Sequence, residues 1–361
     1  MNQIKNLKKN TPLRAIMFSV VISGAIASQA QAQTNVTIYG RVDAGIDYQS
    51  NQVNTTTGQR GGQWGTGGNS WGTSMFGFTG NEDLGGGLKA IFTLENGFNA
   101  SNGQVNGGSG LWTRRSFVGL TGGFGTVKIG RDLTLPSDIT WSIDPTGQQN
   151  LSTATLVGGR NWPQESNQVQ YISPGMGGFT AQGAYGFGGV AGENKPNSTG
   201  GVALTYVQPA FSLVAMYDFA ADANGQYSSL FQDSKETTLG GTVTIDKLKL
   251  FAGWENLSAP AVTSGPDKAN HFWLGANYQL TPALTLIGAA YHVKLNQNVG
   301  SANLFMLGTN YSLSKRTLLY ASIGTIRNGA NTDFQVEAGG PTPGLTGQNQ
   351  NAFYTGVSHS F

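Results

Sequence analysis

The chain has 361 residues, no cysteine and only 11% charged residues, and its 21 basic residues nearly balance 19 acidic ones. The lack of cysteine excludes a disulfide framework, so the fold itself must supply the stability. The near balance of charge excludes a strongly basic protein that binds nucleic acid. Glycine, at 54 residues, is about twice as frequent as the usual roughly 7%, but it lacks the three-residue period of collagen.

The first 32 residues have the pattern of a cleaved secretory signal peptide. Four basic residues between Lys5 and Arg14 precede the apolar stretch 15–27. Ala30-Gln31-Ala32 then fits the small-x-small pattern of signal peptidase, which predicts cleavage before Gln33. A membrane anchor is the alternative, but the stretch is shorter than the roughly 20 apolar residues that span a bilayer. The remaining chain keeps 17 basic residues (21 − 4) against 19 acidic ones, a net charge of −2.

The segment that follows, residues 36–48, predicts a long strand with two different faces. It reads VTIYGRVDAGIDY, with apolar or small residues at every even position. The odd positions include Arg41, Asp43 and Asp47. Strict alternation of this kind is typical of a strand with one apolar and one polar side. The apolar face consists of Val36, Ile38, Val42, Ala44 and Ile46.

The same alternation continues to the end of the chain. It predicts sixteen strands of roughly eight to twelve residues, and after the first these lie within 76–95, 114–130, 167–187, 202–219, 237–255, 272–292, 304–324 and 351–361. Short turns such as Asp246-Lys247 alternate with long polar loops such as 49–73, 99–112 and 324–350. No domain boundary interrupts the pattern, so residues 33–361 are predicted to form one domain.

This pattern favours an all-β, transmembrane antiparallel β-barrel of sixteen strands over a soluble sheet protein. A soluble β-sandwich or solenoid usually has about 25% charged residues, whereas this chain has 11%. Inside a bilayer every backbone N–H and C=O must be paired, and a closed barrel achieves this. Short turns at one end, long loops at the other and aromatic residues near the strand ends are further marks of outer-membrane barrels.

Several segments resemble the general porins of the Gram-negative outer membrane, and the resemblance runs from Val36 to Phe361. The motifs are IYGRVDAGI, FGFTGNEDLGGGLKAIFTLE, RSFVGLTGGFGTVKIGRD and the terminal GVSHSF. The resemblance implies a sixteen-stranded barrel with a third long loop folded inward, a homotrimer, and passive diffusion of small hydrophilic solutes and ions. It also implies that the terminal aromatic residue, Phe361, is the signal for barrel assembly.

The resemblance further implies a constriction in which acidic residues of the third long loop face basic residues of the wall. Here the loop is 131–160, and Asp138 and Asp144 resemble the acidic positions, with Asp132 as a weaker third. The proline-acid-phenylalanine-glycine signature of the loop is absent. The predicted basic wall consists of Arg41, Arg114, Arg160, Lys89 and Lys128.

Strand parity assigns these basic residues to the two faces of the wall. Arg114 is expected to face inward if Phe117 faces lipid, and Arg115 is then expected to face outward, at a subunit contact. Arg131 shares its parity with Val127 and is expected at a strand end or subunit interface.

The sequence departs from the family pattern at two positions of the basic wall. Met75 stands where the family commonly has a basic residue, and Thr79 replaces a common lysine. We expect this thinner basic wall to weaken any preference for anions, because rings of charged side chains set the ion preference of a pore.

Other kinds of chemistry find little support in the sequence. His271, His292 and His359 lie in separate predicted strands without metal-ligand spacing, and there is no cysteine nucleophile, G-x-S-x-G motif or Walker loop. We therefore predict no enzyme activity, no cofactor and no metal. The expected partners are outer-membrane lipid or lipopolysaccharide, not nucleic acid. The alternatives are a substrate-selective channel and a structural or adhesive barrel that binds through its loops.

Overall fold

The computed structural model describes residues 35–54, 56–106, 110–337 and 346–361. The predicted signal peptide, residues 1–32, lies outside these described residues. Within them, no helix is long and apolar enough to cross a membrane.

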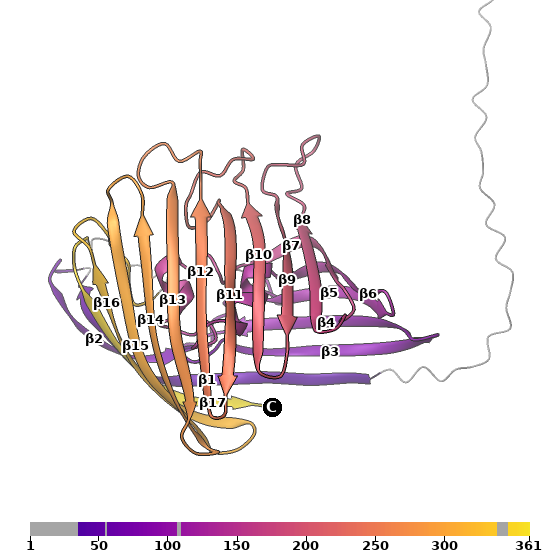
Figure 1. The fold of residues 1–361 in the computed structure, drawn as a ribbon, viewed down its shortest axis with the longest axis horizontal. Coiled ribbons are helices and arrows are strands. Elements are labelled where there is room, and N and C mark those ends of the chain that lie inside the picture. Colours follow the sequence, from indigo (N-terminus) through magenta and orange to yellow (C-terminus); the bar gives the residue numbers. More distant parts are fainter. Residues whose placement is uncertain (1–34, 55, 107–109, 338–345) are drawn as a thin grey trace, which may run out of the picture. The chain divides into compact units, whose positions relative to one another are not determined.

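One sheet of seventeen antiparallel strands makes up the described chain (Figure 1). The strands are β1 (Asn35–Val53), β2 (Arg60–Gly68), β3 (Ser74–Gly85), β4 (Leu88–Phe98), β5 (Arg115–Gly122), β6 (Gly125–Leu133), β7 (Gln164–Ile172), β8 (Phe179–Gly186), β9 (Thr199–Val207), β10 (Phe211–Ala220), β11 (Lys235–Ile245), β12 (Leu248–Ser258), β13 (Lys268–Gln279), β14 (Leu284–Leu295), β15 (Gly300–Ser312), β16 (Thr317–Asn328) and β17 (Gln350–Ser360).

The sheet closes because the first strand pairs with the last. β1 aligns with β17 from Arg41↔Ser360 onward, and its other edge aligns with β3 over Asn35 to Arg41. β2 pairs only with the C-terminal half of β1, from Ala44 onward. Sixteen strands therefore form the barrel and β2 is an addition to it. The predicted sixteen-stranded antiparallel barrel is confirmed.

Short connections lie at one end of the barrel. They are residues 86–87, 123–124, 173–178, 208–210, 246–247, 280–283 and 313–316. The turn after β3 depends on glycine, because Gly85, Gly86 and Gly87 all have positive φ angles, of 86°, 61° and 81°, which side chains rarely adopt. At the other end the connections between barrel strands are longer, with one exception, residues 296–299.

The outer face of the barrel is apolar. As the alternation predicts, Val36, Ile38 and Ile46 of β1 are exposed to the outside, and Leu274 and Leu307 are about 65% exposed. Phe179 and Tyr206 stack at the short-turn end, with ring centroids 4.2 Å apart. Exposed apolar side chains beneath an aromatic belt are the outer surface that a bilayer requires.

The third long loop, residues 134–163, folds into the barrel, as predicted. We call this segment loop 3. It contains α1 (Leu135–Ile139), which Thr134 caps, and the short 3₁₀ turns η1 (Thr140–Ser142) and η2 (Thr153–Val157). Figure 1 shows these coils among the strands, with β10–β15 in front of them.

Loop 3 covers the inner faces of β9–β16, and most of the buried apolar cluster lies between the two. Glycines in the wall provide the space. A Cβ built on Gly240 would lie 2.6 Å from Ile143 Cδ1, and one on Gly324 would lie 2.7 Å from Leu151 Cδ1. The indole of Trp273 donates a 2.8 Å hydrogen bond to the carbonyl of Ile143. The loop is thus fixed by packing against the wall.

Candidate functional site

Arg41 projects from β1 into the interior, opposite Met75 of β3. Its Nε donates a 3.0 Å hydrogen bond to the carbonyl of Thr73, and its guanidinium lies 5.4 Å from the ring centroid of Trp71. It forms no ion pair with the described residues. Arg41 is therefore held by the first long loop with its charge left without an acidic partner.

Glu95 of β4 is a second centre of charge on this wall, and sequence reasoning missed it. Its carboxylate is buried, forms an ion pair with Arg114 Nε at 2.7 Å and accepts a 2.8 Å hydrogen bond from the Tyr39 hydroxyl. Arg114 also lies 3.5 Å from the hydroxyl of Thr73. The alternation of β4 contained the signal, because Glu95 follows the inward parity of Lys89.

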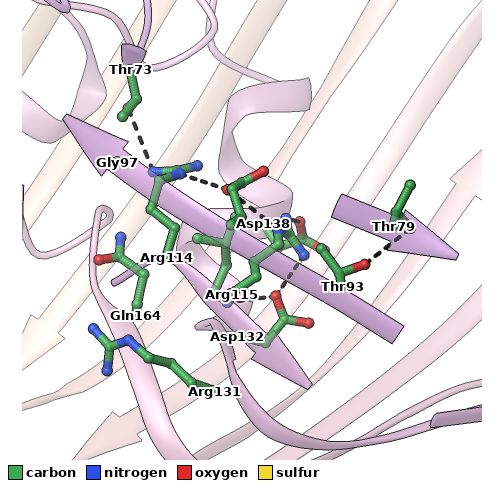
Figure 2. A network of polar contacts seen from close by, with 12 residues as sticks. Thr73, Thr79, Thr93, Gly97, Arg114, Arg115, Arg131, Asp132, Asp138 and Gln164 are labelled. Atoms are coloured by element: carbon green, nitrogen blue, oxygen red, sulfur yellow. Dashed lines mark hydrogen bonds and ion pairs between the residues drawn. The ribbon is translucent and has the colours of Figure 1, made fainter. Parts of the chain in front are cut away.

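The expectation that Arg115 faces outward is wrong. Its guanidinium lies 2.5 Å from Asp132 Oδ1 and 3.3 Å from Asp138 Oδ1, inside the barrel (Figure 2). The expectation assumed that Phe117 faces lipid. Instead Phe117 faces the interior, with its ring centroid 5.0 Å from Lys128 Nζ, and Val118 is exposed to the outside. Arg115 has the parity of Phe117 and therefore also faces inward. Arg114 precedes the first residue of β5, so strand parity does not govern it.

Asp132 and Lys128 complete this charged wall from β6. Lys128 Nζ lies 2.5 Å from Asp132 Oδ2, so Asp132 joins Lys128 to Arg115. Asp132 thus belongs to the strand and not to loop 3. Among the predicted acids only Asp138, on α1, faces the basic wall from the loop. We call Arg41, Glu95, Arg114, Arg115, Lys128, Asp132 and Asp138 the charged cluster.

The structure does not bring Asp144 to the charged cluster. The Asp144 carboxylate is 2% exposed and accepts hydrogen bonds from the backbone N–H groups of Thr146 and Thr153 and from the hydroxyl of Tyr291. The Thr146 hydroxyl is a fourth donor to the same carboxylate. These four donors replace its lost hydration, so burial is tolerated without a basic partner. Asp144 fixes loop 3 to β14, which differs from its predicted position opposite the basic wall.

Arg160 also departs from its predicted place. It is 3% exposed and lies 2.8 Å from Asp218 and 3.6 Å from Glu236, on the inner face of β10 and β11. A buried charge needs partners of opposite sign, and these two carboxylates supply them. Arg160 therefore anchors the end of loop 3 and does not line the same wall as Arg41.

Lys89 and Arg131 do not join the ion pairs of the charged cluster, although Arg131 is next to Asp132 in the chain. Lys89 faces inward but is exposed, opposite Asp83 near the short turn. It lies six positions before Glu95, which is roughly 20 Å along a strand. Arg131 Nε donates to the carbonyl of Thr113 at 2.6 Å, and its NH1 donates to Ser166 Oγ at 2.7 Å.

The histidines do not gather into a metal site within the described chain, where no group of three potential ligands could hold a metal ion. His271 is buried beside Glu255, at 3.4 Å. His292 contacts Asn303 and His359 contacts Thr317.

A closed barrel with an inward loop and a charged interior defines a channel of the outer-membrane type. The family model described as Gram-negative porin matches residues 19–332. The chain therefore belongs to the Gram-negative porin family, and the predicted resemblance is confirmed. As a member of this family, the protein is an outer-membrane channel for passive diffusion.

Individual relatives match nearly the whole chain. Outer membrane porin protein 32 of Delftia acidovorans is 28% identical, over 93% of this chain and 97% of its own. An outer membrane porin of Bordetella pertussis is also 28% identical, over 86% and 93% of the two chains. Both relatives are named as porins, which are channels.

Solved structures show the same fold. An anion-selective porin from Comamonas acidovorans superimposes with a TM-score of 0.78 at 26% identity, covering 91% of this chain and all of the other. A trimer form of OmpT from Vibrio cholerae superimposes with a TM-score of 0.64 at 15% identity, covering 91% and 99%.

Proposed function

We propose that the channel is a general diffusion pore of weak ion selectivity, narrowed where α1 of loop 3 approaches the charged wall of β1–β6. The observation that supports this most directly is the balance of charge in the charged cluster. Its four basic residues are balanced by three carboxylates, those of Glu95 and Asp132 on the same wall and that of Asp138 on loop 3. Opposed charges across a narrow water-filled passage orient polar solutes and disfavour apolar ones.

The proposal of weak selectivity differs from the property named for the Comamonas relative, which is anion-selective. In this chain Met75 and Thr79 occupy inward positions of β3 beside Arg41 and Thr93. Three of the four basic residues of the charged cluster are paired with acids, so their fields are partly cancelled. Within the charged cluster, Arg41 is then the one basic residue without an ion pair among the described residues.

Reversal potentials of the purified protein in a planar bilayer, across a KCl gradient, test this proposal. We expect a small potential, because neither ion is strongly excluded. Strong anion selectivity would contradict the proposal. Liposome swelling with sugars of graded size tests the rival functions. A general pore gives a smooth size cutoff, a substrate-selective channel favours one sugar, and an adhesive barrel admits little.

The proposed assembly is a homotrimer, on the precedent of the trimer form of the Vibrio structure. A folded trimer should migrate above the monomer on a gel until it is boiled, and conductance should rise in steps of three. Phe361 is proposed as the assembly signal. It exchanges backbone hydrogen bonds of 3.0 and 3.1 Å with Gly40 at the barrel seam.

The outer surface supports an anionic lipid as a further partner. Lys268, Lys294 and Arg327 are exposed near the long-loop ends of β13, β14 and β16, at outward positions. None of the outward positions on these strands is acidic. Phosphate groups of lipopolysaccharide would complement these cations. We also propose that residues 1–32 are removed on export, which the mass of the purified protein would test.

A further inference from the structure

A pocket of about 420 Å³ lies between loop 3 and the inner faces of β8–β12, and Asp138 belongs both to its lining and to the charged cluster. Asp138 and Trp141 of loop 3 form one side of it. Gln182, Thr205, Thr242 and Lys249 line the wall. Its volume lies within the roughly 300–1,000 Å³ that is typical of sites for small molecules.

Trp141 gives this pocket an apolar surface that the fold does not use. Its side chain is 56% exposed, although the neighbouring Leu135 and Ile139 are buried against the wall. These two residues anchor α1, and Trp141 lies in the turn that follows it, so the backbone places the indole at the surface of loop 3. A fixed, exposed ring in a polar interior is suited to stack on a flat ligand.

Lys249 gives the pocket a free positive charge. Its Nζ lies 4.8 Å from the ring centroid of Phe251, and it forms no ion pair within the described chain. The other charged group of the lining, Asp138, lies 3.3 Å from Arg115, which partly neutralises it. Thr244, the cross-strand neighbour of Lys249, also lines the pocket, and Thr242 and Gln182 add a hydroxyl and an amide elsewhere in the lining.

We propose that this pocket is a binding site for small organic monoanions that carry a flat ring, such as aromatic carboxylates. The ring packs on Trp141 and the carboxylate pairs with Lys249. Binding on the diffusion path raises the local concentration of such solutes in the channel. This inference rests on the proposed function, because the solute must enter through the pore.

Reversible block of single-channel current tests the site, with benzoate as the probe and acetate as the anion without a ring. The bath should hold about 0.1 M KCl, where the Debye length is about 10 Å and a lysine–carboxylate pair is not fully screened. In the wild-type channel we expect benzoate to block at lower concentration than acetate. Benzyl alcohol, which has the ring without the charge, should block less than benzoate.

Variants of the two residues separate the contributions of ring and charge. Trp141→Ala should weaken benzoate block about fivefold and leave acetate block unchanged, because an aromatic pair contributes on that scale. Lys249→Gln should remove the advantage of benzoate over benzyl alcohol, and Lys249→Arg should restore it. The readout is the ratio of blocking concentrations within one variant, so a change in conductance does not affect it.

Matched controls are available at residues outside the pocket. Trp64 is an exposed tryptophan of β2, and Lys247 lies in the short turn two residues before Lys249. In Trp64→Ala and Lys247→Gln, the ratio of the blocking concentrations of benzoate and acetate should equal that of the wild type. If KCl conductance is present but benzoate and acetate block equally, or if the controls change the ratio as much as the pocket variants, this inference is overturned. If the wild type shows no conductance, both this inference and the proposed function fail.

Discussion

The inner faces of β3–β6 and of β9–β16 have different surfaces, although both follow the same alternation. The first carries inward charges that form ion pairs, Arg115 with Glu95 and Lys128 with Asp132. The second carries Trp273, Tyr291 and Leu304, all under 5% exposed beneath loop 3. One half of the barrel wall therefore carries paired charges, and the other half packs against loop 3 to form a small apolar core.

This difference assigns separate tasks to the residues of loop 3. The face of the loop toward β3–β6 carries Asp138, which contributes charge. The face toward β9–β16 carries Ile143, Asp144 and Leu151, which fix the position of the loop. Substitutions on the two faces should consequently alter different properties, and the following predictions test that separation.

The largest effect is expected from Arg160→Ala on the covered side. Removing this guanidinium leaves Asp218 and Glu236 buried without their basic partner, which destabilises by about 3–5 kcal/mol. The temperature at which the folded band disappears on a gel should fall. Arg316→Ala, in an exposed short turn, is the control and should leave that temperature in place. Equal effects of the two variants would contradict the anchoring role of Arg160.

Gly324→Val tests the packing of loop 3 directly. A side chain there would collide with Leu151, and such overpacking is typically unfavourable by about 1–3 kcal/mol. The loop should move from the wall, and single-channel conductance should change with it. Gly288→Val is the matched control, since a Cβ there meets only Leu307, at 3.4 Å. A conductance change in the control alone would refute the prediction.

Asp138→Asn and Asp144→Asn should change different properties, the first the ion selectivity and the second the stability. Asp138→Asn removes a negative charge beside Arg115 and should shift the reversal potential toward anions. Asp144→Asn should leave that potential in place but reduce stability by about 1–3 kcal/mol, because an amide satisfies fewer of the four buried donors. The pair should be compared in the same KCl gradient and the same gel assay. If Asp144→Asn shifted the potential as far as Asp138→Asn, the separation of tasks would not hold.

Arg41→Gln should give the smallest measurable change. A unit charge about 8 Å from a passing ion in water changes its energy by about 0.5 kcal/mol, or roughly twofold in relative permeability. Anion permeability should fall by this factor. Lys89→Gln removes the same charge roughly 20 Å from Glu95 and should leave selectivity unaltered. Equal shifts would place the selective region much nearer the short turns.

The outer face of the barrel could be predicted from sequence because the bilayer imposes one rule on every strand. Val36, Ile38 and Ile46 follow this rule and are exposed on the outer face. The same alternation also allowed the sixteen-stranded barrel to be predicted. The parity of β5 failed because Phe117 is aromatic but lies inside under Lys128. Hydrophobicity alone cannot assign such a residue to a face.

The roles of Asp144 and Arg160 could not be predicted, because they depend on the path of loop 3 across the barrel. Each is tethered to strands far along the chain, Asp144 to Tyr291 and Arg160 to Asp218. A sequence pattern reports local alternation and contains no such distant pairing. The apolar inward residues of β13–β16 were the available sign that something covers this wall.

The attachment of loop 3 by apolar packing has a consequence for how the channel responds to its surroundings. Ion pairs between partly exposed groups weaken as salt rises, since the Debye length shortens from about 8 Å at 0.15 M to about 3 Å at 1 M. Apolar contacts such as that of Leu151 with the wall are not screened. Raising the salt concentration should therefore change the ion selectivity of the channel and leave the size limit for solutes unchanged. Pore size and ion selectivity are thus set by different interactions.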